Sequence, residues 1–294
     1  GELVVGIRAK RLVGTVPGPF LFSKRWMGEN MVFKMKSQPP MRPVDAAAEI
    51  LKHLKKTAED ALECDVTDAV ITVPAYFSLN AKQLTEVAGT RAGLNVAKIF
   101  QEPVAAAQVF LANDPREKVT VMTYDLGGGT FDVSIVRKED GFGDNLAFSG
   151  DSALGGFNFD KLLADWIKQR ILERHADSGI EVNDTSIDAR IMDMAERCKI
   201  ALSNKDRVEV KLSESGLQDK DGNVLSDVLE ICRSEFEEMI LPDLRNTLVK
   251  CEEARVAAKI EKSEIDVVLL IGGSSKIPLV SELLEREYNQ LPHS

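Results

Sequence analysis

The stretch Tyr124-Asp-Leu-Gly-Gly-Gly-Thr-Phe-Asp132 predicts a glycine turn between two neighbouring strands. Residues 119–124, which lead into it, are mostly β-branched and apolar, a composition typical of strands. From 131 to 135 apolar residues alternate with polar ones, and this period of two predicts a second strand. We therefore expect a hairpin whose tip consists of Gly127, Gly128 and Gly129.

The composition of this tip favours a phosphate-binding site. Glycine permits positive φ angles and close approach of the backbone, so that successive N–H groups can form a concave site for an anion. Asp125 and Asp132 flank the tip, and their carboxylates repel a bare phosphate but can hold the water shell of a phosphate-bound Mg²⁺. Thr130 adds a hydroxyl group. The alternative is a plain glycine-rich hairpin, and the two aspartates together with Thr130 favour the ligand site.

Two further glycine pairs precede predicted helices. Gly155-Gly156 is one, and Gly272-Gly273 follows the apolar strand 266–271. Glycines between a strand and a helix let a phosphate lie against the backbone near the positive end of the helix, although such turns also occur without a ligand. The sequence contains no P-loop, no dinucleotide fingerprint and no Gly-x-Ser-x-Gly elbow.

Composition excludes several classes of protein. The net charge of −10 over 294 residues argues against binding to nucleic acid or to an anionic membrane as the main task, because both depend on an excess of Lys and Arg. The longest apolar runs are far shorter than a membrane span. The four cysteines are scattered without metal-ligand spacing. We expect a reducing intracellular compartment, the cytoplasm or an organellar matrix.

The pattern of strands and helices predicts the α/β class with mixed sheets. We expect helices at 44–62, from Ser78 to about 89–93, from Pro103, at 159–175, at 186–202 and from Pro278. Further strands are expected at 68–73, 96–100, 208–212 and 266–271. A capping box of Ser234 and Glu237 predicts one more long helix, which should kink or break near Pro242. The polar segment 113–118 is the expected boundary between two lobes.

Taken together, these motifs resemble the nucleotide-binding domain of the DnaK-type, seventy-kilodalton heat-shock chaperones, within the actin-like ATPase superfamily. The resemblance covers nearly the whole chain and is carried by residues 9–11, 23–28, 69–77, 101–107, 124–132, 150–156 and 271–278. It implies two lobes around a nucleotide cleft: a first lobe at 1–115, a second at 116–294, and an outer subdomain of the second lobe around 155–235. It also implies that ATP or ADP binds with Mg²⁺, and that ATP hydrolysis drives cycles of client binding and release.

The resemblance also assigns roles to single residues. It implies that Lys10 positions the attacking water and the γ-phosphate, and that Thr130 and Asp132 take part in catalysis. Glu102 and Asp125 should hold Mg²⁺ through water and contribute to the same chemistry. The remaining implied contacts with the nucleotide are Gly127, Gly128, Gly129, Thr130, Gly155, Gly156, Glu196, Lys199, Ser203, Gly272, Gly273, Ser274 and Lys276.

The chain departs from the family pattern in ways that leave other functions open. Ile200 and Lys276 stand where the family has arginines, one of which stacks on adenine, and Phe157 replaces a glutamate. The family's Asp-Leu-Gly-Thr-Thr loop does not precede Lys10 and its closing helix is not in the printed sequence, so we expect slow ATP hydrolysis by the chain as printed. A non-catalytic actin-like regulatory or interaction domain is the alternative, and a sugar or glycerol kinase is a third hypothesis.

The resemblance implies two protein partners, a J-domain co-chaperone and a nucleotide-exchange factor. Client polypeptides would bind through a domain that lies outside this sequence. We expect no nucleic-acid partner and no membrane association, in agreement with the acidic composition.

Overall fold

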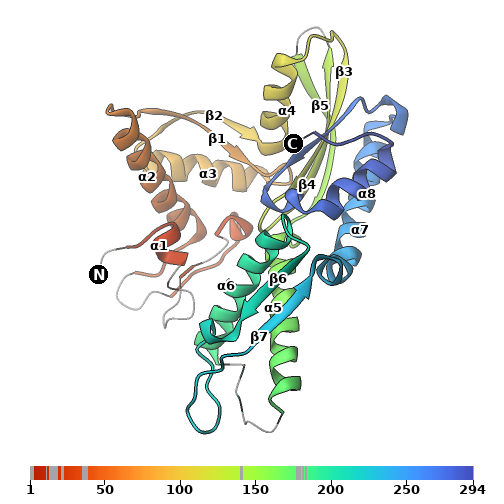
Figure 1. The fold of residues 1–294 in the computed structure, drawn as a ribbon. Coiled ribbons are helices and arrows are strands. Elements are labelled where there is room, and N and C mark those ends of the chain that lie inside the picture. The colour runs from red at the N-terminus through yellow and green to blue at the C-terminus, as the bar shows by residue number, and fades with distance from the viewer. Residues whose placement is uncertain are drawn as a thin grey trace.

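The computed structural model describes residues 3–10, 12, 19–20, 23–34, 39–139, 142–176, 180, 182 and 184–293, without the side chains of Ile7, Lys10, Phe142 and Thr185. Figure 1 shows its helices and strands in three groups: a first group up to β2, a central sheet with helices beside it, and a third group built around α5 and α6. The sheets are parallel, mixed and antiparallel, which confirms the α/β class. Among the described residues, no helix combines the length and hydrophobicity needed to cross a membrane.

The first group contains two parallel strands and the helices beside them. Its elements are α1 (Ile7–Lys10), η1 (Ser23–Trp26), α2 (Pro43–Leu62), β1 (Asp68–Val73), α3 (Leu79–Arg91) and β2 (Asn95–Gln101). α2 and α3 pack through Val44, Ala48 and Ala88. The Ser78 side chain accepts a hydrogen bond from the Ala81 backbone N–H at 3.2 Å, so the predicted N-cap of α3 is confirmed.

The central sheet has the strand order β5-β4-β3-β8. Its strands are β3 (Val119–Leu126), β4 (Phe131–Glu139), β5 (Phe142–Asp151) and β8 (Val267–Ile271), and only the β3–β8 pair is parallel. α4 (Glu102–Asn113) packs on this sheet through Ala107 and Leu111. α7 (Arg233–Ala258) contacts β4, β5 and α8 (Pro278–Tyr288). A buried hydrogen bond of 2.7 Å joins Tyr124 of β3 to Thr247 of α7.

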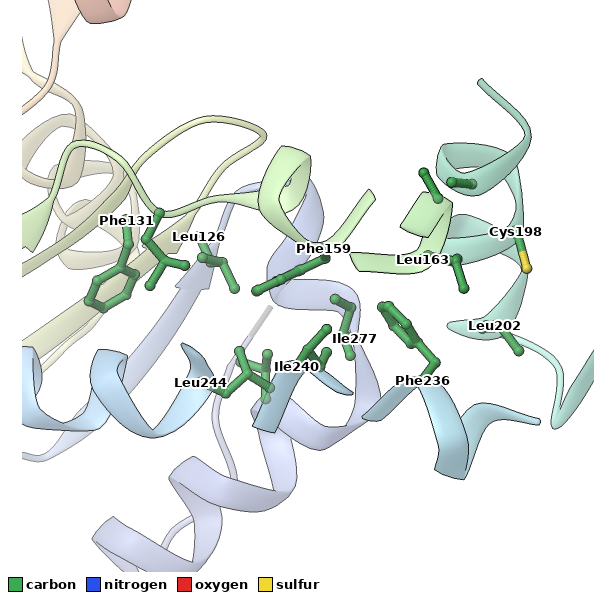
Figure 2. Packing of buried hydrophobic residues seen from close by; sticks show 14 of the residues in the cluster. Leu126, Phe131, Phe159, Leu163, Cys198, Leu202, Phe236, Ile240, Leu244 and Ile277 are labelled. Atoms are coloured by element: carbon green, nitrogen blue, oxygen red, sulfur yellow. The ribbon is translucent and has the colours of Figure 1, made fainter. Parts of the chain in front are cut away.

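The third group contains α5 (Gly156–Arg174), α6 (Thr185–Leu202) and the antiparallel strands β6 (Arg207–Lys211) and β7 (Val228–Cys232). Short 3₁₀ turns are η2 (Leu212–Glu214), η3 (Lys262–Glu264) and η4 (Gly273–Lys276). One hydrophobic core joins this group to the central sheet. Figure 2 shows that core passing from Leu126 and Phe131 beside the hairpin, through Phe159, to Leu163 and Cys198 on α5 and α6. The hairpin tip is therefore supported by well-packed residues on its inner side.

Three details differ from the sequence prediction. The predicted capping box of Ser234 and Glu237 is wrong, because the N-cap of α7 is Cys232, two residues earlier, and Glu235 accepts a hydrogen bond from the Cys232 N–H at 3.0 Å. The predicted break of the helix near Pro242 is also wrong, since α7 continues through this residue. The sequence analysis names neither β5 nor β7 as strands. β5 has a register shift in its pairing with β4, which interrupts the alternation of its side chains, and β7 joins α7 without an intervening turn residue.

Candidate functional site

The glycine hairpin lies where β3 meets β4, as the sequence predicts. Asp125 and Asp132 are register partners on these strands, and Asp125 also pairs with Ile271 of β8. The Gly127 N–H donates to the Thr130 carbonyl at 3.0 Å and closes the tip. The three glycines and Thr130 thus form a tight turn directly beside two carboxylates.

Three successive carbonyl groups of the tip are held by other parts of the chain. The Gly127 carbonyl accepts from the Gly156 N–H at 2.9 Å, and the Gly128 carbonyl accepts from the Phe157 N–H at 2.7 Å, both at the start of α5. The Gly129 carbonyl accepts from Arg25 Nε at 2.8 Å and also from Nη2 of the same side chain.

This arrangement orients the amides of the tip. In a trans peptide the N–H points opposite to the carbonyl of the preceding residue. Fixing the carbonyls of 127, 128 and 129 therefore sets the N–H directions of Gly128, Gly129 and Thr130. Within the described residues, the Gly128 and Gly129 N–H groups have no hydrogen-bond partner. Neighbouring unpaired amides of this kind form a site for an anion.

The predicted glycines divide into two kinds. A side chain at Gly155 would place its Cβ 2.6 Å from the Gly129 backbone, one at Gly156 would overlap the Ser274 hydroxyl, and one at Gly272 would lie 2.6 Å from Asp125 Oδ1. These three allow α5, the hairpin and the 272–276 turn to approach one another, so packing alone accounts for them, and Gly272 also has a φ of +85°.

Gly128 and Gly273 belong to the second kind. A Cβ at either position would meet no heavy atom within 4 Å, and neither residue has a positive φ. The fold itself therefore does not require glycine at these two positions. Both residues are exposed, and a bound ligand that approaches the backbone would account for the missing side chains.

Asp132 is buried and Asp125 is half-buried, and the electrostatic environment of both opposes ionisation. Asp132 is 1% exposed, and its Oδ1 has no hydrogen-bond partner among the described residues. Burial, with the nearby charges of Asp125 and Glu102, raises the pKa of Asp132 to about 7. Burial and the charge of Glu102 raise the pKa of Asp125 to about 6. A cation at this position would favour the ionised forms of both groups, so the donor set fits Mg²⁺.

The sequence-based hypothesis has Glu102 and Asp125 hold Mg²⁺ through water. Among the described residues, no three His, Cys, Asp or Glu side chains are placed to ligate one ion directly. Mg²⁺ commonly keeps several of its waters and is bound by few protein ligands. The arrangement of Glu102 and Asp125 therefore fits contact through water, as the sequence-based hypothesis requires.

A lysine lies beside these acids, but it is not the one that the sequence analysis selected. Lys24 of η1 contacts both carboxylate oxygens of Glu102, at 2.7 and 2.9 Å. Its positive charge partly offsets the upward shifts in the pKa values of Asp125 and Asp132. Lys10 ends α1, and its side chain is outside the described part of the chain; Gly6, just before α1, lies near His53 of α2. The sequence contains two Lys-Arg pairs, 10–11 and 24–25, and local pattern gives no reason to prefer the second.

Tyr76 is a second residue that the sequence analysis did not single out. Its hydroxyl is buried near Thr130, and burial together with Asp132 and Glu102 raises the pKa of its phenol. It follows Pro74 in the segment after β1, so the first group of elements contributes Lys24 and Tyr76 to one side of the site, where Glu102 joins them from the start of α4. The hairpin provides the opposite side.

The predicted nucleotide contacts on α6 share one helical face. Lys199 of this face is 8% exposed, pairs with Asp160 at 2.7 Å and donates to the Gly156 carbonyl at 3.1 Å. Ser203 Oγ donates to the Lys199 carbonyl at 3.5 Å, and Glu196 lies one turn earlier. Ile200, next to Lys199, is 57% exposed. Lys199 thus links α6 to the start of α5, directly beneath the hairpin.

The 272–276 turn is attached to the hairpin from the other side. Ser275 Oγ accepts a hydrogen bond from the Leu126 N–H at 3.2 Å and donates to the Ile271 carbonyl. Ser274 is 6% exposed and lies close to Gly156, whereas Lys276 is exposed. The structure therefore brings the hairpin, the start of α5, Lys199 and the 272–276 turn into one site.

Comparison with known proteins agrees with this geometry. A family model described as Hsp70 protein matches residues 19–294. The chain belongs to the Hsp70 family. It is similar to the chaperone protein DnaK of Mycoplasmopsis pulmonis (strain UAB CTIP), with 38% identity over 293 residues that cover 100% of this chain and 48% of that protein. The DnaK proteins of Mycoplasmopsis synoviae (strain 53) and Mesomycoplasma hyopneumoniae (strain 7448) are 37% and 38% identical, over 100% and 99% of this chain and 48% of each relative.

Family membership confirms the DnaK-type assignment and the actin-like α/β fold. The chain spans about half the length of the curated relatives that it matches. The matched part is their N-terminal half, and this Hsp70 chain corresponds to a DnaK-type nucleotide-binding domain.

Proposed function

We propose that this Hsp70 chain binds Mg²⁺-ATP at the glycine hairpin and hydrolyses it. The observation that carries the proposal is the pair of amides at Gly128 and Gly129, unpartnered within the described residues, beside the half-buried carboxylate of Asp125 and the buried carboxylate of Asp132. Amides that attract an anion and acids that attract a cation, side by side, suit a phosphate chain carrying Mg²⁺.

The phosphates would lie against the hairpin. The N–H groups of Gly128, Gly129 and Thr130 would donate to phosphate oxygens, and the missing side chain at Gly128 would permit the approach. The ribose and base would lie between α6 and the 272–276 turn, near Glu196, Lys199, Ser203, Gly272, Gly273, Ser274 and Lys276. Gly155 and Gly156 would contribute by holding α5 against the hairpin.

Bound Mg²⁺ would neutralise charge on the phosphate oxygens, with Asp125 and Glu102 contacting its waters. Asp132, whose Oδ1 is unpartnered within the described chain, would orient a water molecule and accept a proton from it. The Thr130 hydroxyl lies beside Asp132 at the tip of the hairpin.

We further propose that the catalytic lysine is Lys24. Its ammonium group contacts Glu102 and its charge acts on both aspartates, so it can stabilise negative charge that develops on the transferred phosphoryl group. A role for Lys10 remains a prediction from the resemblance alone.

Single-turnover hydrolysis of Mg²⁺-ATP by Lys24→Ala and Lys10→Ala variants tests both assignments. The Lys24→Ala rate should fall by about 10²–10³-fold, the loss typical of one oriented electrostatic donor, and Lys10→Ala should hydrolyse ATP at the parent rate. The reverse result would return the role to Lys10. ATP binding without hydrolysis in the parent would instead favour a non-catalytic regulatory domain, and a parent that binds no ATP would refute the site.

The activity, partners and location of the longer relatives are proposals for this chain. We propose that ATP hydrolysis here drives cycles of client binding and release, through a client-binding domain outside this sequence. J-domain co-chaperones and nucleotide-exchange factors are the proposed partners, and a reducing compartment such as the cytoplasm the proposed location. The division into lobes at 1–115 and 116–294, with an outer subdomain around 155–235, is part of the same proposal, and α4 would join the two lobes because it contacts both β2 and the central sheet.

A further inference from the structure

Arg25 connects η1 to the hairpin tip over a separation of 104 residues in the sequence. Its Nε donates to the Gly129 carbonyl at 2.8 Å and its Nη2 donates to the same oxygen. The adjacent residue on η1, Lys24, contacts Glu102. One short turn therefore contacts both the acidic side of the site and the glycine tip.

The carbonyl that Arg25 holds completes a series of three. The first two, on Gly127 and Gly128, are fixed by backbone amides of α5, and the position of α5 is determined by the hydrophobic core. The third, on Gly129, is fixed by the guanidinium group of a side chain from another part of the fold. Glycine has the widest backbone freedom of any residue, so the peptide between Gly129 and Thr130 depends on that bond for its orientation.

We propose that Arg25 is a positioning residue for phosphate binding: by holding the Gly129 carbonyl it turns the Thr130 N–H toward the ligand. The inference rests on the proposed function, because it concerns the same anion site. Affinity for the phosphate chain then depends on how η1 sits against the hairpin, so that the first group of elements controls the shape of a loop that belongs to the central sheet.

The test measures Mg²⁺-ATP and adenosine binding by calorimetry to the 294-residue chain and to Arg25→Ala and Arg25→Lys variants. Lysine keeps the charge but lacks the planar fork of donors, so it separates orientation from simple attraction. Arg91→Ala is the matched control, because Arg91 pairs with Asp45 in the same group of elements and makes no contact with the described residues of the hairpin. Thermal unfolding of each ligand-free variant verifies folding.

Both Arg25 variants should bind ATP about tenfold or more weakly than the parent, the loss expected for hydrogen bonds that involve a charged group. Adenosine, which lacks phosphates, should bind all proteins equally, and Arg91→Ala should behave as the parent. Millimolar guanidinium should restore ATP binding to Arg25→Ala, whereas methylammonium should not.

The outcomes separate the inference from the function on which it rests. If the parent binds ATP and Arg25→Lys binds it as tightly, charge alone suffices and the positioning role is overturned while the proposed function stands. An equal loss of adenosine and ATP affinity would also overturn it, since the defect would then be a general change in the fold. A parent that binds no ATP would refute the proposed function and this inference together.

Discussion

Replacing Gly128 by valine should abolish nucleotide binding and leave the fold intact. Most substitutions of turn glycines damage the protein itself, because the φ angle or a close neighbour requires glycine. Gly128 has neither constraint: its φ is not in the left-handed region, and a Cβ there would meet no atom within 4 Å. The variant therefore isolates the role of the ligand.

The expected magnitudes follow from this geometry. Replacing glycine in a permitted conformation changes the free energy of unfolding by at most about 1 kcal/mol, and commonly stabilises. The side chain would stand between the phosphate and the amides of Gly128 and Gly129. Each hydrogen bond to a charged group contributes about 1.5–3 kcal/mol, so losing both costs about 3–6 kcal/mol. That corresponds to an increase in Kd of about 10²–10⁴-fold.

Gly155→Ala provides a contrasting variant, which should lose stability. Its Cβ would lie 2.6 Å from backbone atoms of Gly129, which cannot move aside easily. Overlap of this kind typically costs about 1–3 kcal/mol of stability. Calorimetry with Mg²⁺-ATP and urea unfolding of the ligand-free proteins measure the two quantities. Unchanged ATP affinity in Gly128→Val would refute the assignment of the hairpin as the phosphate site, however stable the variant is.

Three further predictions concern the buried polar groups. Because the pKa of Asp132 is raised to about 7, the native chain binds more protons than the unfolded chain between about pH 4 and 7, so its stability falls as pH rises through that range. Asp132→Asn should remove most of this dependence of stability on pH and raise the unfolding free energy at about pH 8 by more than ~1 kcal/mol. Equal slopes of stability against pH in urea titrations of the two proteins would contradict the burial argument. Glu102→Gln should reduce the dependence of ATP affinity on Mg²⁺, so that EDTA weakens binding less than in the parent; an unchanged EDTA effect would exclude Glu102 from the metal site. Thr247→Val should lower the free energy of unfolding by about 1–3 kcal/mol, because it leaves the Tyr124 hydroxyl without a partner, whereas Thr247→Ser should leave stability close to that of the parent. Equal stability of the two variants in chemical unfolding would contradict a role for this bond.

Features specified by neighbouring residues were predictable. The Ser78 cap, the strands around the glycine tip and the helix from Pro278 depend on contacts within a few residues, and all are confirmed. The prediction failed where pairing or packing partners decide the structure. The start of α7 depends on β7 ending at Cys232, and β5 is a strand because β4 provides a backbone to pair with, despite its irregular register.

By itself the sequence determined the residue types of the proposed site, glycine turns with acids beside them, and a signature that identifies the Hsp70 family. Only the tertiary structure decided which residues meet. It placed Lys24 against Glu102 and brought Arg25 to within hydrogen-bond distance of the Gly129 carbonyl. It also distinguished Gly128, which faces open space, from Gly155, which faces backbone. The physical reason is that residue type and spacing fix local conformation and charge, whereas burial, raised pKa values and contacts between distant segments exist only once the chain has packed.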